Sequence, residues 1–305
     1  MSERVLVTGG LGFIGSRLCA ALLDQGADVH VVDDLSGHYA EGTGPTAAEM
    51  LAARGAEVTI ARADPAHLKG RDAVIHLAGL PGVRTRRPPA ALHKANVVLT
   101  ERLVRAASAG GARFLLVSSS SVYGNATELP TPEHAPPAPL NPYAASKVAA
   151  EDVVRDHGAD GVIVRPFSVY GPGQRPEMAF ARWIDCLHTG RPLPWCASPG
   201  TARDFTYVDD AVAGIRAALR RGRAGEAYNL SGWRSVDLRA ALAVLEEESG
   251  CRASLATTPG SAAEARVTRG CGRKAAAELG YEPRTDLAAG LRYQLAAASP
   301  DRIAA

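Results

Sequence analysis

Three glycines, Gly9, Gly12 and Gly15, follow a short apolar run at residues 4–8 and open a helical pattern at residues 14–25. Glycine permits the tight turn, lets the backbone approach a pyrophosphate, and lets the helix pack closely on the strand. The helix N-terminus then offers unpaired N–H groups and the positive end of its dipole to the phosphates. This strand–loop–helix order predicts a dinucleotide-binding loop at the start of an open sheet.

Short apolar runs alternate with helical patterns through the first half of the chain. Continuous β-rich runs between helices indicate a parallel sheet that is covered on both faces. We therefore expect the α/β class with a doubly wound parallel sheet, the Rossmann arrangement. Strands are predicted at residues 29–33, 58–61, 73–78, 114–119 and 162–166, and a long helix at residues 90–109.

The regular alternation stops after about residue 168, where Pro- and Gly-rich segments begin. A helix at residues 208–220 and a strand at 227–230 fit a return to the main sheet. We therefore expect two domains. The NAD-binding Rossmann domain would comprise residues 1–167 plus about 206–229, and a smaller C-terminal substrate lobe would comprise 168–205 and 230–298.

The composition excludes several classes of function. The 305 residues carry 34 basic and 32 acidic side chains, a net charge of +2, so no nucleic-acid partner is expected. No apolar run reaches the ~18 residues of a membrane span. The five cysteines form no CxxC pair, so neither a disulfide scaffold nor a metal site is expected. Without a signal peptide before the first strand, we expect a cytoplasmic protein.

Asp33 ends the second predicted strand, where a carboxylate can accept hydrogen bonds from both hydroxyls of an adenosine ribose. Asp34 adds a second negative charge, and no Lys or Arg stands between Arg17 and Arg54. This stretch therefore contains no cation that could neutralise the 2′-phosphate of NADP. The cofactor is therefore expected to be NAD rather than NADP.

Tyr143 and Lys147 stand four residues apart at a helix start that Asn141-Pro142 introduces. They therefore share one helix face, one turn apart. A tyrosine pKa near ~10 makes a poor base, but a neighbouring ammonium and a positive nicotinamide both favour the tyrosinate. Tyr143 could then accept the proton of a sugar hydroxyl while hydride leaves the same carbon.

Four serines at residues 118–121 follow the strand predicted at residues 114–119. The carboxyl ends of parallel strands form the ligand crevice of such sheets. Buried hydroxyls need hydrogen-bond partners, so a serine run at this edge favours a ligand-facing role over a purely structural one.

Several ordered segments of the chain resemble the extended short-chain dehydrogenases/reductases that act on nucleotide sugars. The resemblance runs from about residue 4 to residue 295, and within that family it is strongest to NAD-dependent UDP-glucuronate 4-epimerases. The segments are TGGLGFIG (8–15), HLAG (76–79), SSSSVYG (118–124), NPYAASK (141–147), RPFSVYGPGQRP (165–176), RDFTYVDD (203–210) and LGYEPRT (279–285).

The resemblance implies roles for individual residues. Ser119, four residues before the tyrosine of VYG, would hydrogen-bond the sugar O4, beside the catalytic pair Tyr143 and Lys147. The related dehydratases and decarboxylases carry an acid two residues before that tyrosine, where this chain has a serine. The substrate site implied in this way comprises Ser119, Ser120, Ser121, Ser168, Arg175 and Arg203.

Asp64 and Pro65 follow the third predicted strand. The Asp64 carboxylate is a candidate for the adenine side of the cofactor, although an ordinary loop position fits it as well. The cofactor site expected from the glycine loop and from the resemblance comprises Gly9, Gly12, Phe13, Ile14, Gly15, Asp33, Asp34, Asp64, Pro65, Leu77, Ala78, Gly79, Asn96, Tyr143, Lys147 and Pro166.

The predicted function is an NAD-dependent nucleotide-sugar 4-epimerase that acts by transient oxidation at C4, with UDP-glucuronate as the expected substrate. A nucleotide-sugar dehydratase and a neutral-sugar 4-epimerase stay open as alternatives. A catalytically silent nucleotide-binding protein of the same fold would be expected to lack Tyr143 or Lys147, and both are present. Relatives pair through two helices, so the resemblance implies a homodimer through residues 90–109 and 143–157.

Overall fold

The computed structural model describes residues 2–36, 43–82, 87–196, 198–258 and 262–298. In these residues a seven-stranded, wholly parallel sheet has the order β11-β6-β5-β4-β1-β2-β3. The order reverses at β1, which places a crevice at the carboxyl ends of β1 and β4. The strands are β1 (Arg4–Thr8), β2 (Asp28–Asp33), β3 (Glu57–Ile60), β4 (Ala73–His76), β5 (Arg113–Val117), β6 (Gly161–Pro166) and β11 (Ala227–Leu230).

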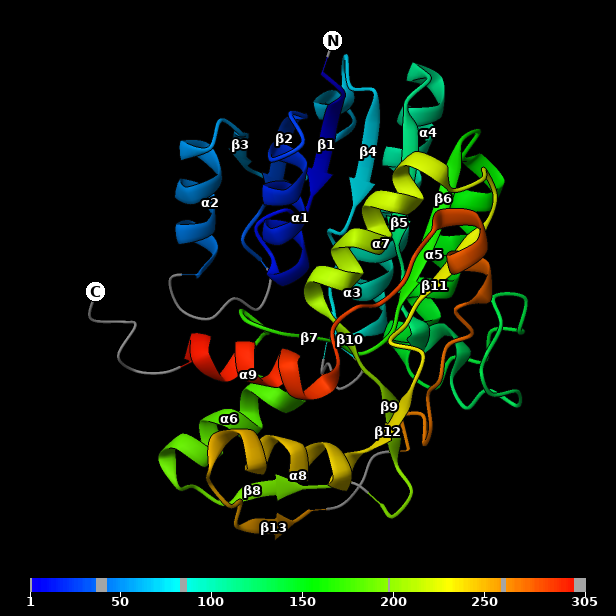
Figure 1. Ribbon diagram of the computed structural model, residues 1–305. Helices are drawn as coiled ribbons and strands as arrows, with labels where there is room; N and C mark the ends of the chain where they lie inside the picture. Colours follow the sequence, from blue (N-terminus) through cyan, green and yellow to red (C-terminus); the bar gives the residue numbers. More distant parts are fainter. Residues whose placement is uncertain (1, 37–42, 83–86, 197, 259–261, 299–305) are drawn as a thin grey trace.

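Helices cover both faces of the sheet, as the alternation predicts (Figure 1). On one face, α1 (Phe13–Leu23) packs against α7 (Val208–Arg221), and α2 (Thr43–Ala53) lies beside α1. On the other face, α4 (Leu99–Gly110) packs against α5 (Pro142–His157). The fold prediction of a doubly wound parallel sheet is confirmed.

The long helix expected at residues 90–109 is present but carries one wider turn. It begins as α3 (Pro89–His93), passes through a π-helical turn, η2 (Lys94–Val98), and continues as α4. π-turns inside α-helices occur frequently at functional sites because they redirect a side chain. The redirected side chain here is Asn96, which is 2% exposed and faces the end of β4.

An N-cap residue and a proline fix the first residue of helix α5. The side chain of Asn141 accepts a hydrogen bond from the Ala144 amide at 2.9 Å, and Pro142 occupies the first helical position. Arg155 and His157 lie in the last turn, where positive charge favours the dipole. The start of α5 is therefore fixed by local interactions, and with it the position of the residues one turn later.

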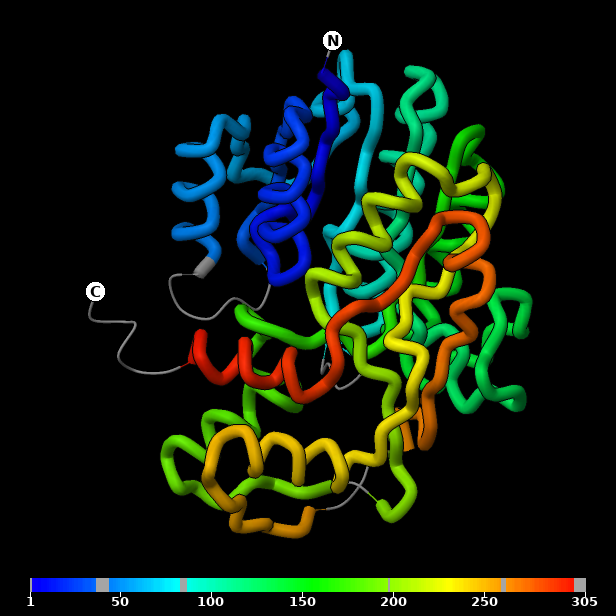
Figure 2. Tube along the Cα trace, in the orientation of Figure 1, coloured from blue at the N-terminus to red at the C-terminus, as the bar shows by residue number. Residues whose placement is uncertain are grey.

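A second group of elements lies below the carboxyl edge of the sheet (Figures 1 and 2). In Figure 2 the red tube of α9 runs between the sheet and the lower helices, and aromatic and aliphatic side chains from these elements form one core. Its elements are β7 (Val169–Tyr170), α6 (Ala179–Thr189), β8 (Leu193–Trp195), β9 (Ala202–Asp204), β10 (Thr206–Tyr207), β12 (Ser235–Asp237), α8 (Leu238–Ser249), β13 (Leu255–Thr257) and α9 (Leu287–Ala298).

Three short helical turns complete the described secondary structure. They are η1 (Pro65–Leu68), η3 (Ser120–Tyr123) and the π-helical η4 (Ala275–Leu279). A smaller lobe was expected at residues 168–205 and 230–298. β10 lies outside those ranges, and η4 lies inside them but packs against α7. The division of the chain into two domains at those boundaries stays a prediction.

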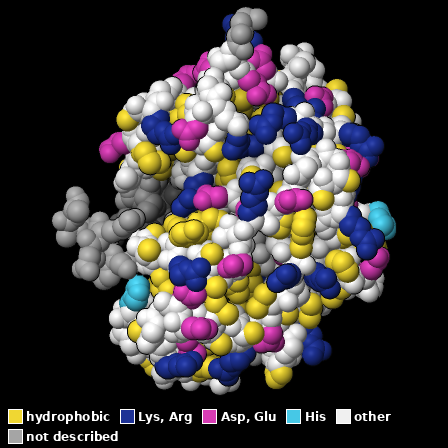
Figure 3. Space-filling view, viewed as in Figure 1, with side chains coloured by type: hydrophobic (Ala, Val, Ile, Leu, Met, Phe, Trp, Pro, Cys, Tyr) yellow, Lys and Arg dark blue, Asp and Glu magenta, His cyan; other side chains and the backbone are white. Residues whose placement is uncertain are grey.

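Basic and acidic side chains are interspersed over the face drawn in Figure 3. Many form exposed ion pairs, such as Arg4 with Asp72 at 2.8 Å and Arg292 with Glu248 at 2.7 Å. Among the described residues, the structure contains no helix that combines the length and the apolarity needed to cross a bilayer.

A buried carboxylate joins three segments of the lower lobe. Asp204, at the end of β9, is 0% exposed and accepts hydrogen bonds from the Gly232 amide at 2.7 Å and the Gly270 amide at 2.9 Å. A buried amide without an acceptor costs about 1–3 kcal/mol. Asp204 therefore holds the strand that carries Arg203 against two loops distant in sequence.

The substitution Asp204→Ala is expected to lower the free energy of unfolding by about 2–4 kcal/mol, because it leaves two buried amides without acceptors. Urea unfolding monitored by circular dichroism measures this. Asp185→Ala removes an exposed carboxylate that pairs with Arg191 and is expected to change stability by less than about 1 kcal/mol. Equal stability of the two variants would contradict the role assigned to Asp204.

Candidate active site

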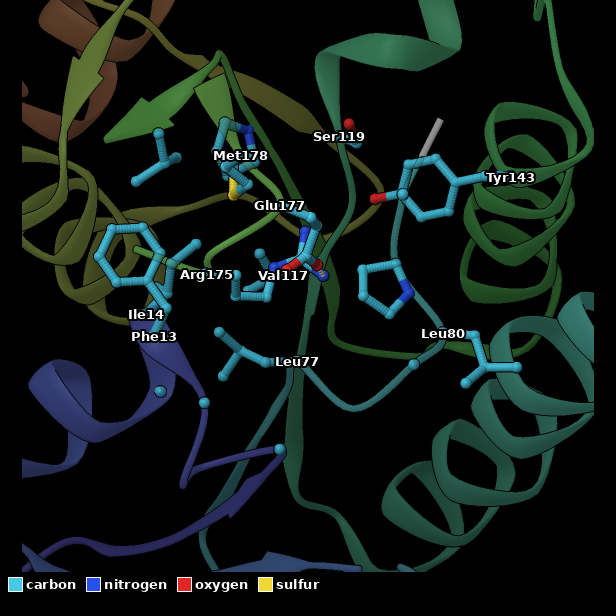
Figure 4. A pocket seen from close by; sticks show the side chains of 18 of the residues that line it. Phe13, Ile14, Leu77, Leu80, Val117, Ser119, Tyr143, Arg175, Glu177 and Met178 are labelled. Carbon is cyan, nitrogen blue, oxygen red and sulfur yellow. Dashed lines mark ion pairs between the residues drawn. The ribbon is translucent and has the colours of Figure 1, made fainter. Parts of the chain in front are cut away.

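One cavity of about 1860 Å³ lies at the carboxyl edge of the sheet, between the sheet and the lower lobe. It extends from the glycine loop after β1, past the ends of β4 and β5, to the loop after β7 and to β8 (Figure 4). Parallel sheets bind ligands at this edge and at this switch in strand order. The cavity is long enough to contain both ends of the site that the sequence predicts.

The glycine loop forms the first end of the cavity. Gly9 has φ +72°, and a Cβ on it would lie 2.7 Å from the Ala78 amide nitrogen. A Cβ on Gly15 would lie 2.3 Å from the Gly9 carbonyl oxygen. Helix α1 begins at Phe13 directly after this turn, so its first amides face the cavity. The backbone therefore forms a cradle suited to a pyrophosphate.

Asp33 ends β2 beside this loop and is 6% exposed. One carboxylate oxygen accepts from the Leu11 amide at 3.1 Å and the other from the Leu35 amide at 3.0 Å. These two bonds hold the carboxylate at the end of β2, on the cavity wall. Asp34 also lines the cavity, and its carboxylate accepts from the Ser36 amide at 3.0 Å.

Asp64 and Pro65 do not line the cavity in the part of the chain that the structure describes. The Asp64 carboxylate caps η1 by accepting from the Ala66 amide at 3.0 Å, and it accepts from Arg102 at 2.6 Å. Each of its two oxygens thus accepts a hydrogen bond from a neighbouring residue of the fold. The structure gives Asp64 a local capping role, and its contact with adenine stays a prediction.

Asn96 also lies behind the cavity and does not line it. Its side chain accepts from the Leu80 amide at 2.7 Å and donates to Ser146 at 2.9 Å. A Cβ on Gly79 would lie 2.7 Å from Oδ1 of the Asn96 side chain. Asn96 therefore shapes the loop after β4. Three residues of that loop line the cavity, as expected: Leu77, Ala78 and Gly79. Pro166, at the end of β6, lines it too.

Ser119, Tyr143 and Lys147 meet at the middle of the cavity. Figure 4 shows the hydroxyl oxygens of Ser119 and Tyr143 directed into the same space. The Lys147 ammonium donates to the Val117 carbonyl oxygen at 3.0 Å, which fixes it at the end of β5. An ammonium has three N–H donors, so two remain for a ligand. The catalytic trio expected from the sequence is brought together by two segments, the end of β5 and the first turns of α5.

Burial raises the pKa of the Tyr143 phenol above its ordinary value. The hydrogen bond with Ser119 and the charge of Arg175 oppose that rise, but the net shift is upward. Burial lowers the pKa of the Lys147 ammonium to about 8, and the carboxylate of Glu151 limits this fall. The phenol is therefore protonated at neutral pH, and its activation depends on the positive charges around it.

The remaining substrate candidates line the part of the cavity beyond Tyr143. They are Ser120, Ser121, Ser168, Arg175 and Arg203. The hydroxyl oxygen of Ser121 is buried and has no hydrogen-bond partner in the structure. A buried polar atom of this kind normally has a partner, so this hydroxyl is unusual in a residue that lines the cavity.

Two glutamates in this region were not predicted from the sequence. Oε1 of Glu177 lies 3.3 Å from Nη1 of Arg175, the ion pair that Figure 4 draws. Oε2 of Glu264 lies 3.3 Å from Nη2 of Arg203. Glu177 follows Arg175 by two positions and directly follows the segment RPFSVYGPGQRP, so its place beside Arg175 could have been predicted from the sequence. Glu264 comes from a segment whose pattern predicts no element, and only the fold brings it to Arg203.

The far end of the cavity is lined by aromatic rings, which the sequence analysis also did not identify. Trp195, at the end of β8, lies 5.7 Å from Trp183 between ring centroids, and the Arg239 guanidinium lies 4.9 Å from the Trp195 ring. Such a flat, partly charged surface suits a planar ligand group. Among the described residues no group of three His, Cys, Asp or Glu side chains could hold a metal ion.

The sequence model described as "NAD dependent epimerase/dehydratase family" matches residues 5–231. The chain belongs to this family. An uncharacterized UDP-glucose epimerase of Bacillus subtilis strain 168 is 34% identical over 316 residues, covering 96% of this chain and 97% of its own. A dTDP-glucose 4,6-dehydratase of Streptomyces griseus is 32% identical, covering 97% of this chain and 94% of its own.

Solved structures of the epimerase/dehydratase family agree with this placement. The crystal structure of UDP-glucuronic acid 4-epimerase from Bacillus cereus, in complex with UDP-glucuronic acid and NAD, superposes with a TM-score of 0.91. It is 32% identical to this chain and covers 97% of it and 98% of its own chain. The expected family is confirmed, and the chain is an NAD-dependent enzyme of the nucleotide-sugar epimerase/dehydratase family.

The cavity fits NAD, the cofactor of this family. A Cβ at Gly9 or Gly15 would overlap neighbouring backbone, so glycine at these positions allows the tight turn that presents the first amides of α1 to a pyrophosphate. Asp33 lines the cavity at the end of β2, and Lys147 retains two donors near the other end. The individual cofactor contacts of these residues stay predictions.

Gly15→Ala is expected to lower NAD⁺ affinity at least about tenfold and to destabilise the fold by about 1–3 kcal/mol, because its Cβ would overlap the Gly9 carbonyl. Calorimetric titration with NAD⁺ and a thermal melt measure the two effects. Gly110→Ala is the matched control, since open space surrounds that position near the end of α4. Unchanged NAD⁺ affinity in Gly15→Ala would contradict the cradle.

Proposed function

We propose that this chain is an NAD-dependent nucleotide-sugar 4-epimerase whose substrate carries a carboxylate at C6, with UDP-glucuronate as the specific candidate. The observation that supports it most directly is that Arg175 lines the same cavity as Ser120 and Ser121, the last with a hydroxyl that has no hydrogen-bond partner among the described residues. Hydroxyl donors together with a guanidinium suit a bound carboxylate.

The end of β5 supports epimerisation rather than dehydration. Dehydratases of the family have an acid where this chain has Ser121, and the neighbouring position is Ser120. A serine hydroxyl is a poor general acid and cannot take up a proton in the way that a carboxylate can. Because the dTDP-glucose 4,6-dehydratase of Streptomyces griseus is a relative of nearly full length, a nucleotide-sugar dehydratase is retained as the second candidate. Its supporting observation is Glu177, a carboxylate that lines the same cavity.

The chemistry assigned to the residues follows from their positions. Bound NAD⁺ supplies a reversible acceptor for the hydride on C4. Tyr143 accepts the proton of the C4 hydroxyl, and Ser119 orients that oxygen through its own hydroxyl. Lys147 supplies the positive charge that favours the tyrosinate. Tyr143 returns the proton after the 4-keto sugar has presented its other face.

The nucleotide half of the substrate is assigned to the lower lobe. Arg203 lines the cavity from β9, and a guanidinium matches the geometry of a diphosphate. Ser168, after β6, adds a hydroxyl next to the sugar. The homodimer through α4 and α5, like the cytoplasmic location, stays a prediction.

With wild-type enzyme, kcat/KM is expected to be far higher for UDP-glucuronate than for UDP-glucose. Ser121→Ala and Arg175→Ala are each expected to lower that ratio about 10- to 100-fold, because each removes a hydrogen bond to a charged group. Arg191→Ala, an exposed arginine on the loop before β8, is the control. Equal turnover of both sugars by the wild type would refute a carboxylate site and leave 4-epimerisation standing.

Product analysis separates the two candidate reactions. Mass spectrometry and proton NMR of the products are expected to show an unchanged mass and inversion at C4. Loss of water would instead identify a dehydratase.

Tyr143→Phe is expected to abolish turnover and leave substrate affinity close to wild type, because only the proton-transferring oxygen is lost. Ser119→Ala is expected to reduce kcat less, since Tyr143 remains. Steady-state kinetics together with equilibrium titration of the substrate measure this. A rate near wild type in Tyr143→Phe would show that another group is the base.

A further inference from the structure

A carboxylate outside the cavity continues the line of catalytic residues along α5. Glu151 lies one helical turn after Lys147, which lies one turn after Tyr143, so the three share one face of the helix. The Glu151 side chain is 1% exposed. A carboxylate buried this deeply is retained in ionised form only when it is paired with a cation and hydrogen-bonded.

Four hydrogen bonds satisfy this carboxylate. One oxygen accepts from the Ser118 hydroxyl at 2.6 Å and from Arg165 Nε at 2.9 Å. The other accepts from Arg165 Nη2 at 2.6 Å and from Arg155 at 2.9 Å. The two bonds to Arg165 are a bidentate pair, the strong form of a guanidinium–carboxylate contact. Glu151 is therefore fixed in both position and charge.

The Ser118 hydrogen bond links Glu151 to the catalytic segment. Ser118 lies between Val117, whose carbonyl oxygen accepts from the Lys147 ammonium, and Ser119. Its amide donates to the Val164 carbonyl oxygen at 2.8 Å, which fixes it to β6. Glu151 thus determines where the carboxyl end of β5 lies relative to α5.

The charge of Glu151 also acts on Lys147 through the low-dielectric interior. Burial drives the pKa of Lys147 down to about 8, and Glu151 is the charge that opposes this. Burial alone would raise the pKa of Glu151 itself, but hydrogen bonds from Arg165 and Ser118 and the Arg165 charge outweigh it, so the net shift is downward. At neutral pH the interior thus holds an anion one turn from the ammonium.

The other titratable groups packed against this pair do not supply that anion. On β4, burial lowers the pKa of His76 to about 3, so the ring is neutral. On η3, burial raises the pKa of Tyr123 to about 12, so its phenol is neutral as well. Arg165 on β6 and Arg155 on α5 are cations, and both contact Glu151.

We propose that Glu151 is a positioning residue of the reaction: its carboxylate, fixed by Ser118 and Arg165, keeps the Lys147 ammonium charged and seated on the Val117 carbonyl. An ammonium offers two donors to the cavity beyond the one that Val117 uses, and its charge favours the tyrosinate of Tyr143. A neutral amine would lose that charge. The effect of Glu151 on turnover rests on the proposed function, whereas its effect on the charge of Lys147 does not.

The pH at which Lys147 loses its proton can be measured without an activity assay. The chain contains four lysines, Lys69, Lys94, Lys147 and Lys274. NMR titration of protein labelled with ¹³C-lysine therefore gives four signals, and the Lys147→Arg variant assigns one of them. In Glu151→Gln, the Lys147 midpoint is expected to fall by about one pH unit, as loss of a unit charge one turn away requires. Glu151→Asp keeps the charge and is expected to keep the midpoint near wild type.

Kinetics give the second readout. In Glu151→Gln, the alkaline limb of the kcat–pH profile is expected to move to lower pH by about the same unit, with KM little changed. Arg155→Ala is the matched control, because it removes a half-exposed partner of Glu151 without removing the carboxylate. It is expected to leave both the Lys147 midpoint and the profile at wild-type values.

Glu151→Gln leaves Arg165 buried without its anion, which threatens folding. If that variant does not fold, the double variant Glu151→Gln/Arg165→Gln removes both charges, and a smaller fall in the Lys147 midpoint is expected, because loss of the Arg165 cation offsets part of the effect. A Lys147 midpoint unchanged in the folded variant, with only a lower melting temperature, would overturn the proposal by showing a purely structural role. Failure of the proposed function would appear separately, as loss of water in the products of the wild-type enzyme.

Discussion

A buried ion pair between Glu151 and Arg165 holds helix α5 on the carboxyl ends of β5 and β6. Arg165 extends the connection by donating to the Tyr123 hydroxyl at 2.6 Å, and Tyr123 donates to Asn229 at 2.8 Å. Removing one member of such a network strands a buried charge, which costs about 3–5 kcal/mol. The serine segment and the Lys147 ammonium thus rest on a rigid polar support that lies outside the cavity.

The cavity joins two regions of different electrostatic character. Around the glycine loop, backbone amides supply dipoles, and Asp33 and Asp34 supply two anions. Beyond Tyr143, two arginines stand beside glutamates, Arg175 beside Glu177 and Arg203 beside Glu264, both at 3.3 Å. These cations are held in place by neighbouring carboxylates, so an anionic substrate enters a region whose charges are already positioned.

Much of this arrangement was predictable because local rules determine it. The strand at residues 4–8 and the glycine turn follow from apolar runs and glycine geometry, and α5 begins at Pro142 because Asn141 caps it. Helix α2 was not predicted, and its segment shows no clear pattern. The placement of Asp64 could not be foreseen, since its contact with Arg102 depends on how α4 packs beside η1.

The sequence by itself determined the fold class, the cofactor loop and the spacing of Tyr143 and Lys147, because these depend on residues close together along the chain. Only the tertiary structure decided which polar groups are buried and what they contact. It placed Asn96 behind the cavity, buried the Ser121 hydroxyl without a hydrogen-bond partner among the described residues, and set a glutamate beside Arg203. Burial and charge pairing arise from segments that meet across long stretches of sequence, and no local pattern encodes which segments will meet.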